Sequence, residues 1–145
     1  MLKGLDPLLS PDLLMYLRAM GHGDEIVIVD ANFPADSRGQ RLVRLDGVSA
    51  TAVLDAVLSV MPLDEFVPEP AWRMEVVGDP AAEQPIFSEF RDIIARRESP
   101  ETRLGALERF AFYERADAAY AIIATGEGRL YGNIILKKGI IRPQN

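Results

Sequence analysis

The only histidine of this chain, His22, stands between two glycines in the segment Met-Gly-His-Gly-Asp. Histidine is the side chain whose unperturbed pKa lets it take up or release a proton near neutral pH. The segment joins a predicted helix to a predicted strand, and loops held by such elements often carry catalytic groups. His22 is therefore the first candidate for acid–base chemistry. The alternative is an exposed histidine after a helix-capping glycine, with no chemical role.

A scattered set of polar residues can accompany this histidine: Asp30, Arg109, Tyr113, Tyr120, Tyr131 and Asn133. Such a set suits non-covalent acid–base chemistry on a polyhydroxylated ligand. Each member also has a structural alternative. Asp30 can cap the loop that follows it, and Arg109 can pair with a neighbouring glutamate on a solvated helix face. Tyr113, Tyr120 and Trp72 can simply pack. Tyr131 and Asn133 lie two residues apart, so on a regular strand they face the same way.

Several other functions are disfavoured by what the sequence lacks. It has no phosphate-binding Walker loop, no Gly-x-Gly-x-x-Gly after a strand and no Gly-x-Ser-x-Gly segment. One histidine and no cysteine leave no ligand set for a zinc site rich in these residues. A net charge of −6 with dispersed Lys and Arg gives no footprint for nucleic acid. No apolar run approaches the roughly 20 residues that span a bilayer, and an early acid and proline argue against a signal peptide.

The elements that must position these residues alternate along the chain. Helical spacing of apolar residues, with Ser10 and Ser49 as caps, predicts helices over 11–20 and 50–61. Two further helices are expected over 86–97 and 109–116. Strands are expected over 25–30, 40–45, 71–77, 120–124 and 130–136, the last two joined by a hairpin-like loop. Residues 31–39 and 61–70 are expected to form loops. This alternation predicts one layered α/β domain spanning residues 1–145.

Five segments of the chain together resemble the RbsD/FucU family of ribose pyranases and fucose mutarotases. They are 20–26 (Met-Gly-His-Gly-Asp-Glu-Ile), 30–35 (Asp-Ala-Asn-Phe-Pro-Ala), 109–116 (Arg-Phe-Ala-Phe-Tyr-Glu-Arg-Ala), 125–127 (Thr-Gly-Glu) and 131–139 (Tyr-Gly-Asn-Ile-Ile-Leu-Lys-Lys-Gly). The likeness runs from Leu2 to about Ile140. The segment that begins at Arg109 is similar to the fucose branch, whereas the ribose branch has a histidine in this region. The likeness is weakest between residues 71 and 107.

The resemblance implies a role for each candidate residue. It places the catalytic histidine at His22 and sugar-binding contacts at Asp30, Arg109, Tyr131 and Asn133. It implies a compact α/β domain with a mixed β-sheet flanked by helices, no cofactor and no metal. It also implies a ring-like homo-oligomer, most often a decamer, with the pocket at a subunit interface. We therefore expect the segment 131–133 to lie near His22 and Asp30 across such an interface.

The function that follows is the interconversion of the α and β anomers of a free monosaccharide, with L-fucose as the expected sugar. We therefore expect an isomerase located in the cytoplasm, and the dispersed charge and the lack of a long apolar run predict neither nucleic acid nor a membrane as partner. Two alternatives stay open at this point. One is isomerisation of the ribose pyranase type, and the other is a non-catalytic, regulatory sugar-binding protein that uses the same pocket.

Overall fold

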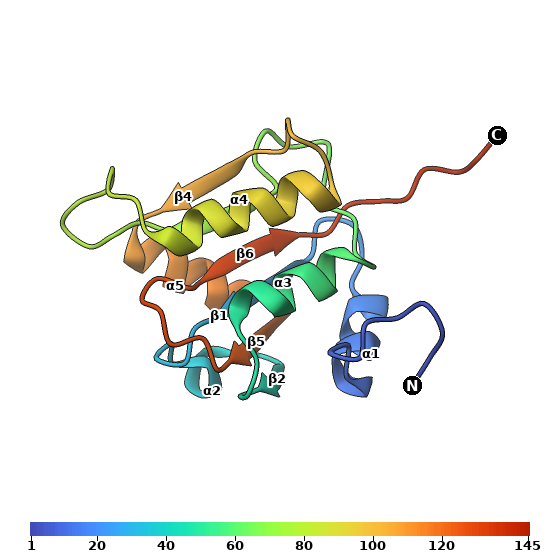
Figure 1. Ribbon diagram of the computed structural model, residues 1–145, viewed down its shortest axis with the longest axis horizontal. Helices are drawn as coiled ribbons and strands as arrows, with labels where there is room; N and C mark the ends of the chain where they lie inside the picture. Colours follow the sequence, from blue (N-terminus) through green and yellow to red (C-terminus); the bar gives the residue numbers. More distant parts are fainter.

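Five helices and six strands follow one another along the chain, and a computed structural model describes all of residues 1–145 (Figure 1). In chain order they are α1 (Pro11–Ala19), β1 (Glu25–Val29), α2 (Ala35–Arg38), β2 (Leu42–Leu45), α3 (Ala50–Leu58), β3 (Ala71–Met74), α4 (Pro85–Arg97), β4 (Leu104–Leu107), α5 (Arg109–Ala118), β5 (Ala121–Thr125) and β6 (Ile134–Lys137). None of these helices has both the length and the apolar composition that a bilayer crossing requires.

All six strands form one mixed sheet in the order β2-β5-β1-β6-β3-β4. Strand β6 runs antiparallel to both of its neighbours, β1 and β3, while the other pairs are parallel. The predicted hairpin between the last two strands is wrong, because β1 lies between β5 and β6. The connection from β5 to β6 therefore passes the C-terminal end of β1, and it carries the candidate residues Tyr131 and Asn133.

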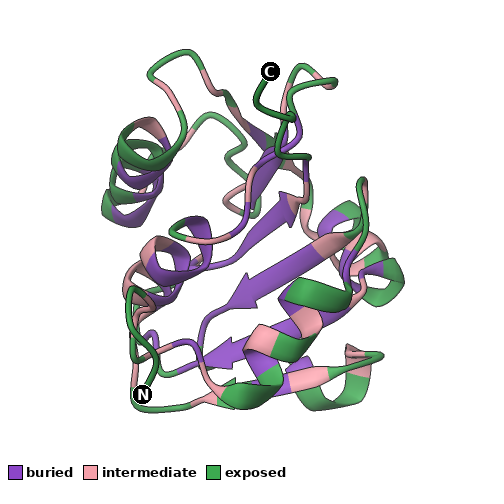
Figure 2. Ribbon diagram, turned by 90° about the vertical axis from the view of Figure 1, so that its right-hand side faces the viewer, coloured by how far each residue is buried: buried purple, intermediate pink, exposed green.

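Helices cover both faces of this sheet (Figure 2), and each face has its own apolar core. The larger core joins α1, α3 and α4 to side chains such as Ile26 and Ile28 of β1. The smaller one joins α5 and α2 to the intervening side chains, such as Val27 and Val29. Alternate residues of a strand face opposite sides of a sheet, which is why the continuous apolar run of β1 is buried throughout. The predicted α/β class with a mixed, helix-flanked sheet is confirmed.

Local signals explain most of the element boundaries. The Ser10 and Ser49 hydroxyl oxygens accept hydrogen bonds from the Leu13 and Ala52 N–H groups, so both serines cap their helices as predicted. Two elements were not expected. The short helix α2 lies in the predicted loop 31–39 and has no side-chain cap. Strand β4 pairs with β3 through a glycine, Gly105, where an added Cβ would lie 1.9 Å from a Glu69 carboxylate oxygen.

Candidate functional site

His22 lies in the tight turn between α1 and β1. The turn needs a backbone angle that L residues rarely adopt, and Gly23 supplies it with φ +88°. The imidazole Nε2 lies 3.0 Å from Oδ1 of Asp64, and its ring lies 5.5 Å from the ring of Phe66. The His22 side chain keeps 45% of its surface exposed, whereas Asp64 keeps 3%. An accessible imidazole is therefore anchored at one nitrogen on a buried carboxylate.

Asp64 is a functional candidate that sequence reasoning missed. Its Oδ1 accepts the Phe66 N–H at 3.1 Å as well as the bond from His22. Burial disfavours the charged form, but the bonds from Phe66 and His22 outweigh it, so the pKa of Asp64 lies below its usual value. A carboxylate at Nε2 favours the tautomer that carries a proton on that nitrogen, which leaves Nδ1 as the nitrogen free to accept one. No local pattern points to Asp64, since it is 42 residues from His22.

A second polar cluster lies where β1 ends and β6 begins. Asn133 donates from Nδ2 to Oδ2 of Asp30 at 3.0 Å, and its Oδ1 accepts the Asp30 N–H at 2.9 Å. Asp30 Oδ1 also accepts the Asn32 N–H at 3.0 Å, so the predicted local capping does occur. Both side chains are buried. Burial raises the pKa of Asp30 despite these hydrogen bonds, which lower it.

Four of the five predicted site residues line a single cavity of about 210 Å³ at this cluster. Its lining residues are Asp30, Asn32, Phe33, Met74, Val77, Arg109, Tyr113, Leu130, Tyr131 and Asn133. Arg109 takes part in no salt bridge, and its buried Nε has no hydrogen-bond partner. Arg109 therefore does not pair with a neighbouring glutamate, which was the structural alternative to a binding role. A buried donor without a partner is costly, so this atom marks a place where a ligand acceptor fits.

Tyr113 joins the same cavity, although sequence reasoning had left it open. It lies four residues after Arg109 on α5, and residues at that spacing share a helix face. That spacing is the signal that identifies it. The Phe33 ring packs against the Tyr113 ring at 5.3 Å, and the Arg38 guanidinium lies 4.4 Å from the ring centre. Tyr120, by contrast, packs against Tyr16 and lies outside the cavity.

Tyr131 reaches the cavity by a route that the sequence did not predict. It precedes β6 and has a positive φ of 62°, so the argument from strand alternation with Asn133 is wrong. Its hydroxyl oxygen accepts the Val77 N–H at 3.1 Å, which ties the segment before β6 to the loop after β3. A non-glycine residue in this conformation is uncommon and often marks a functional segment.

His22 and the cavity lie at opposite ends of β1. His22 precedes this five-residue strand and Asp30 follows it, and an extended strand of that length spans about 16 Å. In Figure 1, α1, which ends shortly before His22, lies on the right, and α2, which begins shortly after Asp30, lies on the left. Within one chain the structure therefore places the segment 131–133 beside Asp30 and away from His22. The expectation that this segment faces Asp30 across an interface is wrong, because both belong to the same pocket.

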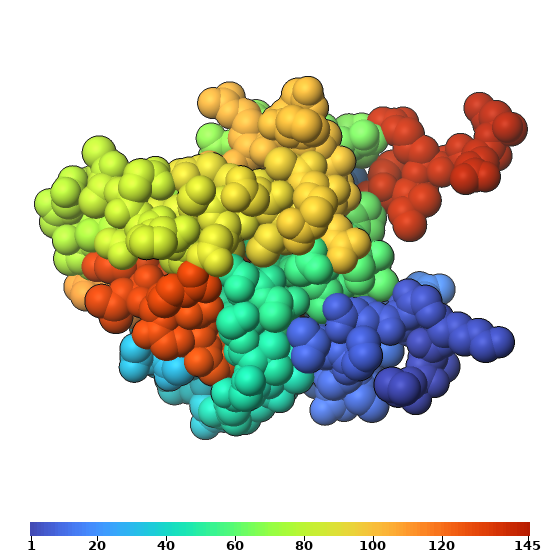
Figure 3. All heavy atoms as spheres, viewed as in Figure 1, coloured from blue at the N-terminus to red at the C-terminus, as the bar shows by residue number.

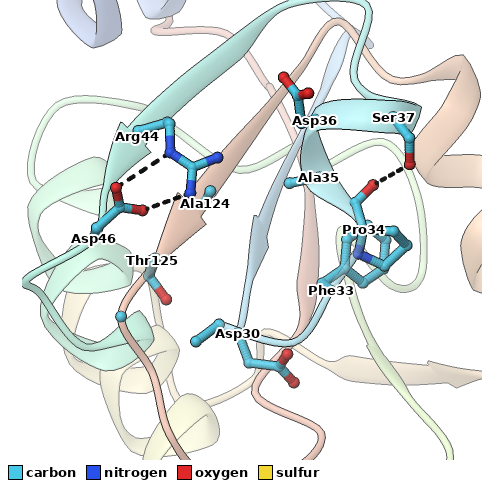
Figure 4. A pocket seen from close by; sticks show the side chains of 12 residues that line it. Asp30, Phe33, Pro34, Ala35, Asp36, Ser37, Arg44, Asp46, Ala124 and Thr125 are labelled. Carbon is cyan, nitrogen blue, oxygen red and sulfur yellow. Dashed lines mark hydrogen bonds and ion pairs between the residues drawn. The ribbon is translucent and has the colours of Figure 1, made fainter.

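A larger cavity of about 480 Å³ opens on the other side of Asp30, between β2, β5 and α2 (Figure 4). Its polar groups are mostly paired with one another. Arg44 binds Asp46 through two hydrogen bonds, and the Ser37 hydroxyl donates to the Pro34 carbonyl at 3.2 Å. The Asp30 carboxylate points away from the Arg44–Asp46 pair in Figure 4. Arg44 and Asp46 satisfy each other, and of the predicted site residues only Asp30 lines this cavity, so it is the weaker candidate for the ligand site.

Comparison with known proteins decides the family. Residues 3–141 match the RbsD / FucU transport protein family. The chain belongs to this family. It is 47% identical over 150 residues to a fucose mutarotase of Bos taurus, covering 99% of this chain and 97% of that one. An L-fucose mutarotase of Glaesserella parasuis is 42% identical over 140 residues, 97% of this chain and 96% of that one.

Solved structures of family members have the same fold. The fucose mutarotase of Streptococcus pneumoniae, solved in complex with L-fucose, superposes with a TM-score of 0.90 at 45% identity, covering 97% of this chain and all of that one. The resemblance carried by the five sequence segments is thus confirmed. In this RbsD/FucU chain the arrangement provides an anchored, accessible imidazole at one end of β1. At the other end it provides a cavity with a carboxylate, a guanidinium, an amide and phenol groups, all of which bind hydroxyl groups well.

Proposed function

We propose that this protein is an L-fucose mutarotase, an isomerase that interconverts the α and β anomers of the free sugar. One observation carries the proposal: the chain is 42–47% identical to fucose mutarotases over almost its whole length. The similar S. pneumoniae structure, which holds L-fucose, supports the same substrate. The polar cavity fits it, since an orphaned arginine donor, a buried carboxylate and an amide are suited to sugar hydroxyl groups.

The proposed chemistry is ring opening and reclosure. The anomeric hydroxyl loses its proton, the bond from C1 to the ring oxygen breaks, and the ring oxygen takes up a proton to give the open-chain aldehyde. Rotation about the bond between C1 and C2 and attack on the other face of the aldehyde form the other anomer. His22 transfers the proton through Nδ1 while Asp64 holds its other nitrogen. Asp30, Arg109, Tyr131 and Asn133 bind the sugar hydroxyl groups in the cavity.

The proposal requires a homo-oligomer. A sugar in the Asp30 cavity lies about 16 Å from His22 of the same chain, too far for proton transfer. We infer that a second copy of the chain places its His22 at this cavity, so that the active site lies at a subunit interface. Closed symmetry is the usual arrangement of identical subunits, and the family resemblance makes a ring-based decamer the expected form. The cytoplasmic location and the absence of a cofactor or metal remain predictions.

The test is NMR exchange spectroscopy of equilibrated L-fucose with and without the protein. We expect faster exchange between the anomer signals with wild-type protein, and the loss of most of that acceleration in His22→Gln, since general acid–base catalysis contributes about 10²- to 10⁴-fold. D-Ribose should be accelerated less. Wild-type rates in a folded His22→Gln protein would exclude the proposed role of His22. If L-fucose bound without any acceleration, the non-catalytic alternative would hold.

A further inference from the structure

The cavity that contains Asp30 has one polar side and one apolar side. Along the sheet edge β6 lies between β1 and β3, so the end of β1, the start of β6 and the end of β3 follow in that order. Asp30 follows β1, Asn133 precedes β6, and Met74 ends β3. Two strand spacings separate β1 from β3 by about 10 Å, a distance comparable to the width of a substituted sugar ring.

The apolar side consists of Met74, Val77 and Leu130. Met74 is buried with 4% of its surface exposed, whereas Val77 and Leu130 are 52% and 65% exposed. Figure 3 shows their two segments side by side on the surface, residues 75–84 in yellow-green above residues 126–133 in orange-red. The hydrogen bond from the Val77 N–H to the Tyr131 hydroxyl holds the two segments together. No charged side chain lines this side, and the polar group next to it, the Tyr131 hydroxyl, is engaged with the Val77 N–H.

On the basis of the proposed function, we propose that Met74, Val77 and Leu130 form a subsite for the methyl group of a 6-deoxy sugar. With the sugar hydroxyl groups on Asp30, Asn133 and Arg109, the carbon that bears the methyl group points along the sheet edge towards β3. A methyl group that packs against these side chains removes apolar surface from water, which favours binding. A hydroxyl group at that carbon gains nothing from these apolar side chains and gives up part of its hydration on contact with them. The subsite therefore selects the class of substrate, 6-deoxyhexoses over the corresponding hexoses.

Three sugars test this selection because they share one ring configuration. L-Galactose carries a hydroxyl group at C6 where L-fucose does not, and D-arabinose has hydrogen in place of the methyl group. We expect the protein to accelerate anomer exchange of L-fucose at least about 10-fold more than that of either analogue at equal subsaturating concentrations, the range for one methylene or hydroxyl group in an apolar pocket. Equal acceleration of L-fucose and L-galactose would overturn the proposal.

Two variants locate the effect. Val77→Thr adds a hydroxyl group at nearly constant shape and leaves its backbone N–H to bind Tyr131, and Leu130→Gln makes the same change of polarity on the opposite segment. We expect the double variant to reduce the preference for L-fucose over L-galactose about 5-fold or more. Met15→Gln is the matched control, an exposed apolar residue of α1 outside the cavity, and should leave the preference unchanged. An unchanged preference in the double variant would contradict the subsite.

A binding measurement separates this inference from the proposed function. In saturation-transfer difference NMR of L-fucose with wild-type protein, the methyl protons should receive the strongest saturation, and the double variant should weaken that signal relative to the ring protons. A strong methyl signal without faster exchange would retain the subsite and reject the mutarotase. Faster exchange with a weak methyl signal would reject the subsite and retain the mutarotase. No binding and no exchange would reject both.

Discussion

Replacing Asp64 by asparagine isolates the charge behind His22. Oδ1 of Asp64 accepts both the His22 bond and the Phe66 N–H, and an asparagine Oδ1 can accept both in the same place. Only the negative charge is removed. At the observed 3.0 Å, Coulomb's law gives about 1.4 kcal/mol in a medium as polarisable as water. That medium is appropriate because His22 is nearly half exposed, and the energy corresponds to about 10-fold in rate.

The assay is anomer exchange of L-fucose, with kcat and KM separated by varying the sugar concentration. Asp64→Asn should lower kcat about 10-fold with little change in KM, since the sugar binds at the other cluster. Asp64→Ala should cost more, because it also leaves the Phe66 N–H unpaired and frees the imidazole. Glu65→Gln is the matched control, as it removes the next carboxylate along the chain, which pairs with Arg142 at the surface. Wild-type kcat in Asp64→Asn, or equal losses in the Asn and Ala variants, would refute this reasoning.

Two further predictions follow from titrating groups. Burial raises the pKa of Asp30 above its ordinary 3.8, so L-fucose binding should weaken as the pH falls through that raised value. Isothermal titration calorimetry at a series of acid pH values should show the affinity for L-fucose begin to fall at a pH above 3.8. An affinity that does not change over this range would contradict a carboxylate role for Asp30. The Arg97 hydrogen bond lowers the pKa of Asp55 to about 2 in the folded protein. The charged carboxylate therefore stabilises the fold at pH values above the pKa of the unfolded chain, and this stabilisation is lost as the pH falls from about 4 to about 2. Urea unfolding at pH 7 should show Asp55→Asn about 1 kcal/mol less stable after allowance for solvent screening, with Asp46→Asn within 0.5 kcal/mol; a difference that persists at pH 2 would contradict the ion pair.

The sequence predicts the elements that local chemistry determines. The capping serines, the β-branched run of β1 and the apolar spacing of α4 all act within a few residues, and each element was found. Pairing of strands is different because it depends on residues far apart. The segment before β6 resembles a hairpin arm locally, yet β1 lies between β5 and β6 and pairs with both of them, while helices cover its two apolar faces.

The same distinction applies to the site. His22, Asp30 and Arg109 stand in recognisable segments, and the structure groups Asp30 with Arg109, Tyr131 and Asn133 as one pocket. The partner of His22 could not be predicted, because Asp64 lies in a proline-rich loop and reaches the imidazole only through the tertiary fold. The strand predicted over 25–30 already separates His22 from Asp30, because a strand places the residues that flank it at opposite ends.

The central claim is that one active site needs His22 of one copy and the Asp30 cavity of another. Co-expression of two inactive variants, His22→Gln and Asp30→Asn, tests it most directly. In mixed oligomers about one quarter of the interfaces join an intact His22 to an intact cavity, so the purified mixture should regain about a quarter of the wild-type rate of L-fucose anomer exchange. Mixed oligomers as inactive as either variant alone would contradict a shared site.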